Sequence, residues 1–150
     1  MPITAVRGII EKHQGHPAAA IAILQDLQKE LMWLPESALR VTALRLGIPL
    51  TQIYGLATFY RSFSLKPRGR HLIQVCLGTA CHVRGAPRIE QSILDNLGIE
   101  IGEMTEDEIF SVERVRCVGC CGLAPVVVID QNFHGKLETK DVMKMLKEYT

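Results

Sequence analysis

The sequence HLIQVCLGTAC, residues 71–81, provides the starting point from which the rest of the chain can be interpreted. Its first half is mostly apolar and predicts a short strand that ends on Cys76. Cys81 follows with C-x4-C spacing, and Gly78 lies between the two cysteines. Because glycine allows close approach of the backbone, amide N–H groups in this loop can point at the sulfur atoms or at a group that they bind.

A second pair of cysteines, Cys117 and Cys121, has C-x3-C spacing and precedes residues 126–129 (VVVI), the strongest strand signal in the chain. In a sheet with strands side by side, two strand ends on one edge bring four thiolates to one point. Four thiolates, two for each iron, are the ligand set of a 2Fe-2S cluster. The spacing therefore favours a 2Fe-2S site made of Cys76, Cys81, Cys117 and Cys121.

Two other interpretations of these cysteines stay open on spacing alone. Structural zinc sites also use four cysteines, usually in two tight turns, and the spacings found here are at the loose end of that range. Thiol–disulfide chemistry, which uses a nucleophilic pair such as C-x-x-C, is the third interpretation. The fifth cysteine, Cys120, is adjacent to Cys121 and is interpreted as a small buried hydrophobe rather than as a ligand.

Composition excludes several classes of partner and location. The chain has 150 residues, 17 basic and 16 acidic, so its net charge of +1 does not favour nucleic acid or an anionic membrane. No apolar run approaches the ~18–20 residues that span a bilayer, and the N-terminus lacks the apolar region of a secretory signal. The odd number of cysteines argues against a secreted disulfide scaffold. We therefore expect a cytoplasmic protein without direct membrane insertion.

The composition changes near residue 65, and residues 1–64 predict a small helical domain. Three helical segments are expected there, the first after Pro17, the second after Pro35 and ending at Gly47, and a short third one over residues 49–54. The apolar positions of the first two share one face each: Ile21, Leu24, Leu27 and Leu31, then Leu39, Ala43 and Leu46. Residues 64–70 (SLKPRGR) read as a linker.

Residues 71–150 predict a second domain of β-α-β-β-β-α order. Strands are expected at residues 71–76, 99–104, 109–116 and 126–129, with a helix at 86–97 that is closed by Gly98. Thr139 is the expected N-cap of the last helix, and His134-Gly135 is expected to form a turn. The fold class is therefore α/β, with a helical domain before it.

The stretch CLGTACHVRGA, residues 76–86, together with CVGCCGLAPV, residues 117–126, resembles the thioredoxin-like 2Fe-2S ferredoxin family. This family includes the E-type subunit of NADH:quinone oxidoreductase (complex I) and the corresponding small subunits of NAD-linked, often electron-bifurcating, hydrogenases and formate dehydrogenases. The segment Tyr54-Gly-Leu-Ala-Thr-Phe-Tyr60 is similar to the family's helical part, so the resemblance covers nearly the whole chain. It implies a thioredoxin-like fold and iron ligation by Cys76, Cys81, Cys117 and Cys121.

The same resemblance implies the role and the partners of the chain. The implied partner is a flavoprotein subunit with FMN, an NAD(H) site and its own iron–sulfur cluster, beside further iron–sulfur, hydrogenase or formate dehydrogenase subunits. We expect the helical region 1–64 to dock to the partner, because the cluster domain does not obviously need it. The sequence GTACHVRGA, residues 78–86, resembles the hydrogenase and formate dehydrogenase subunits more than the respiratory ones. The chain itself has no G-x-G-x-x-G after a strand, no P-loop and no evident catalytic residue. We therefore expect a non-catalytic electron-transfer subunit of an oxidoreductase, the alternative being a structural zinc module for protein assembly.

Four arginines flank the cysteine loops. A cluster held by four thiolates is negatively charged, and nearby positive charge can offset it. Arginines next to a loop are also commonly just solvated. The four positions are Arg84, Arg88, Arg114 and Arg116.

Overall fold

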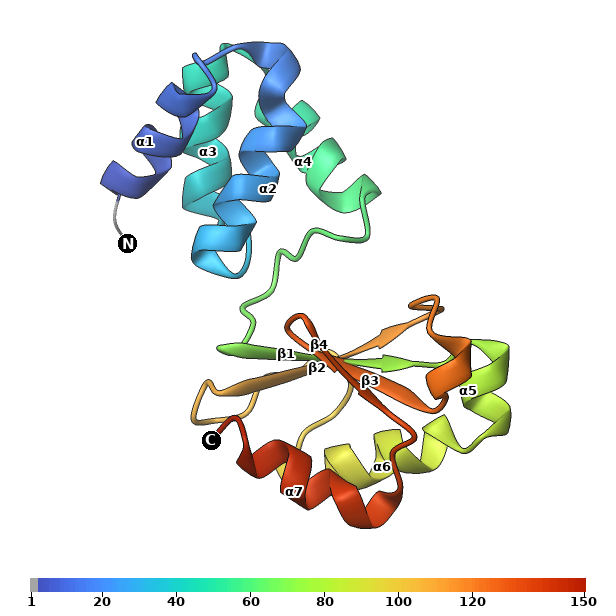
Figure 1. The fold of residues 1–150 in the computed structure, drawn as a ribbon. Coiled ribbons are helices and arrows are strands. Elements are labelled where there is room, and N and C mark those ends of the chain that lie inside the picture. The colour runs from blue at the N-terminus through green and yellow to red at the C-terminus, as the bar shows by residue number, and fades with distance from the viewer. Residues whose placement is uncertain (1–2) are drawn as a thin grey trace. The chain divides into compact units, whose positions relative to one another are not determined.

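The computed structural model describes residues 3–150, and the chain divides into two compact units at Pro67. Unit 1 comprises the residues up to Pro67 and is built from helices (Figure 1). These are α1 (Ile3–Lys12), a 3₁₀ turn η1 (Pro17–Ala19), α2 (Ala20–Leu31), α3 (Glu36–Leu46) and α4 (Leu50–Phe59).

The core of unit 1 follows the helical periodicity. In α3 the predicted face is buried, with Leu39, Ala43 and Leu46 all inside. The helix ends at Gly47, which has φ 64° and donates its N–H to the Ala43 carbonyl, as the sequence predicted. This apolar stripe joins the buried faces of the other helices in one hydrophobic cluster.

Two helical features of unit 1 were not predicted. Helix α1 lies before the first expected helix and buries Val6 and Ile10, which are one turn apart. Helix α4 continues past residue 54, the predicted end, to Phe59 and buries Ile53 and Ala57. Both helices have only ten residues, so burial against the rest of unit 1 is needed to stabilise them.

Unit 2, Arg68–Thr150, is a mixed sheet of four strands with helices on one face (Figure 1). The strand order is β2-β1-β3-β4, in which β1 pairs in parallel with β2 and antiparallel with β3, and β3 pairs antiparallel with β4. Its elements are β1 (His71–Cys76), α5 (Thr79–Val83), α6 (Ala86–Leu97), β2 (Phe110–Val115), η2 (Cys121–Leu123), β3 (Val126–Ile129), β4 (Asn132–Gly135), η3 (Thr139–Asp141) and α7 (Val142–Lys147).

The two faces of the sheet bury different clusters because side chains alternate along a strand. In β3, Val127 and Ile129 pack in the larger cluster, to which α6 and α7 also contribute. Val126 and Val128 point the other way, into a smaller cluster that contains Cys76 and Cys81. Two of the cysteines are thus part of the hydrophobic interior at one end of the sheet.

The predicted strand at residues 99–104 is wrong. This segment is a loop, apart from a single bridge between Met104 and Ser111. Gly98 and Gly102 both have positive φ, 66° and 84°, which an extended strand does not allow. The alternation of Ile99 and Ile101 imitates a strand because both side chains pack half-buried against the core.

Two predictions near the C-terminus also need correction. His134 and Gly135 belong to β4, not to a turn, because Asp130 adopts φ 56° and reverses the chain directly after β3. The last helical segment is capped by Glu138 rather than by Thr139, since the Glu138 and Asp141 side chains form a reciprocal capping box around η3. Helix α7 then begins at Val142.

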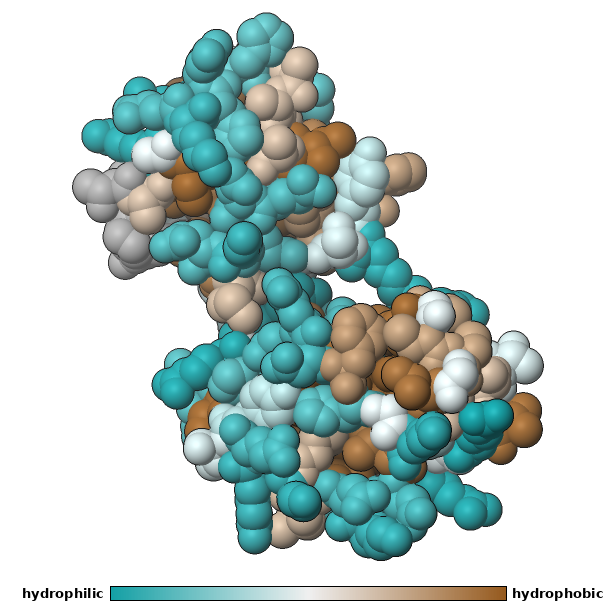
Figure 2. Space-filling view, viewed as in Figure 1, coloured by the Kyte–Doolittle hydropathy of each residue, from teal (hydrophilic) through white to brown (hydrophobic). Residues whose placement is uncertain are grey.

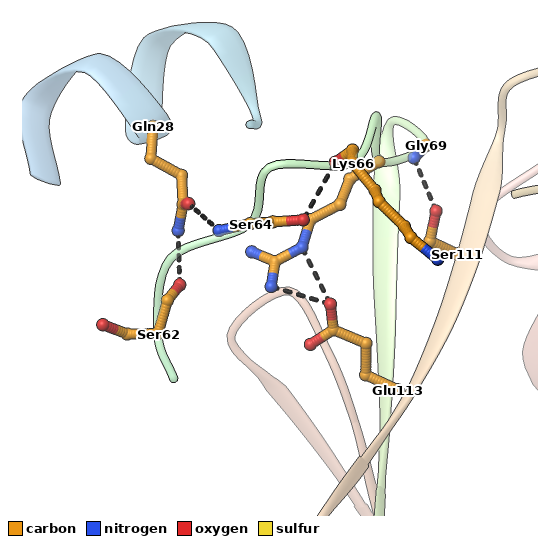
Figure 3. Close-up of polar contacts among 8 residues, drawn as sticks. Gln28, Ser62, Ser64, Lys66, Gly69, Ser111 and Glu113 are labelled. Carbon is orange, nitrogen blue, oxygen red and sulfur yellow. Dashed lines mark hydrogen bonds and ion pairs between the residues drawn. The ribbon is translucent and has the colours of Figure 1, made fainter. Parts of the chain in front are cut away.

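The segment between the units is attached to the unit on each side of it (Figure 3). On the unit 1 side, the Gln28 amide donates to the Ser62 carbonyl and accepts from the Ser64 backbone N–H, both at 2.6 Å. On the unit 2 side, Arg68 pairs with Glu113 at 2.7 Å. The Gly69 N–H donates to the Ser111 hydroxyl at 2.7 Å.

Gly69 has no room for a side chain. A Cβ atom there would lie 2.7 Å from the Phe110 carbonyl carbon and 2.9 Å from the Ile109 carbonyl carbon. We expect Gly69→Ala to lower the free energy of unfolding by about 1–3 kcal/mol, because backbone cannot yield as a flexible side chain does. Chemical denaturation followed by circular dichroism measures it.

The matched control is Gly8→Ala in α1, where a Cβ would meet nothing within 4 Å. Alanine is the better helix former, so this variant should gain about 0.5–1 kcal/mol. An unfolding midpoint for Gly69→Ala equal to or above that of the parent chain would contradict the steric argument.

Candidate metal centre

Three strands bring the four predicted ligands to one edge of the sheet. Cys76 ends β1 and lies opposite Val115, the last residue of the parallel strand β2, so Cys117 follows immediately beyond the same edge. Strand β3 runs antiparallel to β1, so the chain enters it at this edge, just after η2 and Cys121. Cys81 returns to the edge in α5, the short helix after β1.

The cysteines line one cavity of about 640 Å³. Cys76 and Cys81 form its buried side, each with 2% of its surface exposed, whereas Cys117 and Cys121 are exposed at its mouth. The other lining residues come from the same two loops and their flanks, namely Gly78, Thr79, Ala80, Val83, Arg84, Arg116 and Cys120. The predicted ligands therefore surround a common space that is open to solvent on one side.

Backbone N–H groups point at three of the four sulfur atoms. The N–H groups of Gly78 and Val118 donate to the Cys76 sulfur, and that of Val126 donates to the Cys81 sulfur. The Gly119 N–H donates to Cys117 Sγ at 3.3 Å. The role of Gly78 was predicted, whereas the two valines were not, because any residue type can supply a backbone N–H.

Gly78 is needed at its position for steric reasons. A Cβ atom there would lie 2.8 Å from the Arg116 carbonyl oxygen and 3.6 Å from Cys76 Sγ. The loop between Cys76 and Cys81 therefore packs directly on the chain that leads into Cys117. Only a residue without a side chain lets the two cysteine loops approach this closely.

The pKa values of the two buried thiols shift in opposite directions. Burial raises the pKa of Cys76, but the N–H groups of Gly78 and Val118 and the neighbouring thiols favour its thiolate and lower the pKa below its ordinary value. Burial also raises the pKa of Cys81, and the adjacent Cys76 raises it further. Cys76 is therefore the first of this pair to become a thiolate, the form that binds metal.

The fifth cysteine is only partly as predicted. Cys120 is half-buried, its thiol lies 3.8 Å from the Val118 carbonyl, and its side chain lines the same cavity. It also stands in C-x-x-C spacing with Cys117, so the chain does contain a pair with the spacing that thiol–disulfide chemistry uses. His82 next to Cys81 is exposed.

The described histidines in unit 1 have other partners. His13 lies 2.9 Å from the Asp26 carboxylate, and His16 accepts the Ala18 N–H. Within residues 3–150, no group of three or more His, Cys, Asp or Glu side chains is arranged to hold a single metal ion.

The donors fit a 2Fe-2S cluster. The site offers thiols alone, which are the ligands that iron–sulfur clusters use, and it supplies N–H groups that can hydrogen-bond to sulfur. The cradle at Gly78, where a Cβ would collide with backbone, keeps the two loops in contact around this space. The residues present therefore suit the cluster that the sequence predicts.

Comparison with known proteins points to the same cofactor. Residues 6–150 match the family model of thioredoxin-like [2Fe-2S] ferredoxins. The NADP-reducing hydrogenase subunit HndA of Solidesulfovibrio fructosivorans is 36% identical over 140 residues, covering 93% of this chain and 80% of that subunit. The E-type subunit of the NADH-quinone oxidoreductase of Pseudomonas aeruginosa is 37% identical over 147 residues, covering 95% and 89%.

A solved structure supports the fold. An NAD⁺-reducing [NiFe]-hydrogenase in the air-oxidised state contains a chain that matches 87% of this one with a TM-score of 0.75 and 21% identity. The match spans 22% of that longer hydrogenase chain. At 21% identity, this comparison shows a shared fold and nothing further.

The chain belongs to the thioredoxin-like [2Fe-2S] ferredoxin family. The predicted family, the predicted fold class and the 2Fe-2S cluster as cofactor are thereby confirmed. Both named relatives are subunits of oxidoreductases, in agreement with the predicted electron-transfer subunit. Among the described residues, no helix has the length and apolar character needed to cross a membrane.

The contact between the two cysteine loops generates a prediction. Gly78→Ala should push the loops apart and weaken retention of the cluster by about tenfold or more, the size of effect found when the surroundings of metal ligands are disturbed. The measurement is the rate of iron loss to a chelator, followed by the bleaching of visible absorption.

Gly122→Ala is the control, because a Cβ at that position meets nothing within 4 Å and its loop also adjoins a cysteine. It should lose iron at the rate of the parent chain. Equal rates for the two variants would show that the close approach at Gly78 does not matter for the site.

Proposed function

We propose that this chain holds one 2Fe-2S cluster between Cys76, Cys81, Cys117 and Cys121 and transfers electrons as a non-catalytic subunit of an NAD(H)-linked oxidoreductase. The observation that carries the proposal is the meeting of these four thiols around one cavity, at a sheet edge formed by three strand ends. Membership of a 2Fe-2S family supports the choice of cofactor.

The chain's own residues prepare the site for that cofactor. When bound, the cluster supplies transfer of one electron at a time. The lowered pKa of Cys76 makes it the first thiolate available to bind iron. The N–H groups of Gly78, Val118 and Gly119 favour negative charge on the sulfur atoms. Water is excluded from the buried side of the cavity by Ala124, Val126 and Val128. The exposed mouth at Cys117 and Cys121 leaves a short path to a redox partner.

The proposed partner is a flavoprotein subunit with FMN, an NAD(H) site and its own iron–sulfur cluster, together with further iron–sulfur, hydrogenase or formate dehydrogenase subunits. A flavin accepts a hydride and releases single electrons, so a one-electron centre beside it is chemically sensible. The sequence of the first cysteine loop and the similarity to a hydrogenase subunit support a hydrogenase or formate dehydrogenase as the parent complex. Five unpaired thiols suit a reducing cytoplasm.

Unit 1 is proposed to dock to the partner subunits. It contains no cysteine, and it has its own core. Phe59 at the end of α4 and Leu44 on α3 are 80% and 82% exposed. A partner subunit that docks to unit 1 would cover these two exposed apolar side chains.

Replacing the ligands one at a time tests the assignment. Each of Cys76→Ser, Cys81→Ser, Cys117→Ser and Cys121→Ser should weaken cluster binding by at least roughly tenfold, because serine oxygen is a harder and poorer ligand for this site. Iron and sulfide content with the visible spectrum measure the effect. An oxidised 2Fe-2S protein is red-brown, whereas a zinc or thiol protein is colourless.

Cys120→Ala is the matched control, since it removes a thiol of the same cavity and also breaks the C-x-x-C pair. It should leave iron content and spectrum unchanged. If Cys120→Ala loses the cluster while one of the other four variants keeps it, the proposed ligand set is wrong. Stoichiometric zinc without iron in the purified parent chain would support the structural zinc module instead.

The role within a larger oxidoreductase has its own test. The purified chain, kept anaerobic, should be reduced by dithionite to an EPR-active state but should not be reduced by NADH, since it has no nucleotide-binding loop. Adding the flavoprotein subunit should make NADH an effective reductant. Rapid bleaching of the cluster by NADH without flavoprotein would mean that the chain is a self-contained enzyme.

A further inference from the structure

Two arginines line the cavity together with the cysteines. Arg84 follows α5, and its Nη1 donates to the Ala124 carbonyl at 3.4 Å, so it reaches from the first cysteine loop to the second. Arg116 directly precedes Cys117, and its carbonyl packs against Gly78. Each arginine is therefore tied to a defined place beside the thiols, by its side chain or by its backbone.

In the part of the chain that the structure describes, neither of these two arginines has an acidic side chain as an ion-pair partner. The residues 76–89 and 114–129, which contain both cysteine loops, include no Asp or Glu. Among the described residues, the nearby Arg114 is paired with Glu90. Figure 2 shows apolar side chains, together with some hydrophilic ones, at the end of unit 2 that carries α5.

We propose that Arg84 and Arg116 set the reduction potential of the cluster, by stabilising the extra negative charge of its reduced form. The inference rests on the proposed function, since it needs the four thiolates to hold a 2Fe-2S centre. Reduction adds one electron from the partner, with no proton taken up and no bond formed or broken. A fixed positive charge at the cavity lowers the free energy of the more negative state. Without that charge, the cluster is harder to reduce.

The expected effect is specific to the two cavity arginines. Arg84→Gln and Arg116→Gln should each lower the equilibrium constant for one-electron reduction about tenfold, which is a shift of about 59 mV to more negative potential. Arg84→Lys and Arg116→Lys keep the charge and should stay close to the parent chain. High salt should reduce the difference, because both side chains are exposed.

Two other arginines serve as matched controls. Arg88 is exposed in α6 but does not line the cavity, and Arg114 is already paired with Glu90. Arg88→Gln and Arg114→Gln remove the same formal charge from the same unit. They should change the reduction equilibrium by less than about twofold, because neither side chain lines the cavity and a surface charge outside it is largely screened by solvent and salt.

The experiment is an EPR-monitored redox titration of the purified full chain and its variants, after iron content and visible spectrum have shown that each holds a cluster. A downward shift in Arg84→Gln and Arg116→Gln, absent from the Lys variants and both controls, is the expected result. Unchanged potentials with intact clusters, or equal shifts in all four Gln variants, would overturn the inference and leave the proposed function standing. If one Gln variant loses its cluster, the other still decides. A parent chain without iron would overturn the proposed function itself.

Discussion

The site depends on the pairing of β1 with strands on both of its sides. Parallel pairing with β2 places Cys76 opposite Val115, and antiparallel pairing with β3 brings the chain back to the same edge. A shift of one residue in either register would turn Cys76 to the opposite face of the sheet. The alternation of buried clusters on the two faces, with α6 and α7 packed on one of them, fixes that register. Hydrophobic burial therefore contributes to placing the thiols at this edge of the sheet.

A second constraint is the lack of space between the two cysteine loops. Gly78 touches the chain at Arg116, so the loops share a backbone contact that no other residue type would permit. The same contact fixes the neighbouring Arg116, and the Ala124 carbonyl holds Arg84. Close packing thus determines both where the sulfur atoms lie and which positive charges accompany them. Ligand geometry and electrostatics at this site have one structural origin.

The parts of the fold that follow a strong apolar period could be predicted from the sequence. The buried face of α3, the helix α6 with its closing Gly98, and the strands β1 and β3 belong to this group. The predictions failed where the backbone conformation produced a structure other than the one that the side-chain pattern indicated. At residues 99–104 the apolar alternation suggested a strand, yet glycines with positive φ bend the chain. At β4 a tight reversal at Asp130 created a strand where the sequence suggested only a turn.

The same division applies to the candidate site. The cysteines and Gly78 could be identified from the sequence because their role depends on residue type and spacing. The N–H donors at Val118 and Val126 could not, because any residue supplies an N–H and only the fold aims it. Nor could the sequence separate Arg84 and Arg116 from Arg88 and Arg114, since all four flank the loops. The difference between them is one of neighbours: Glu90 compensates Arg114, and Arg88 lies outside the cavity. A charge affects the cluster through its distance and its partners, and these are properties of the folded chain.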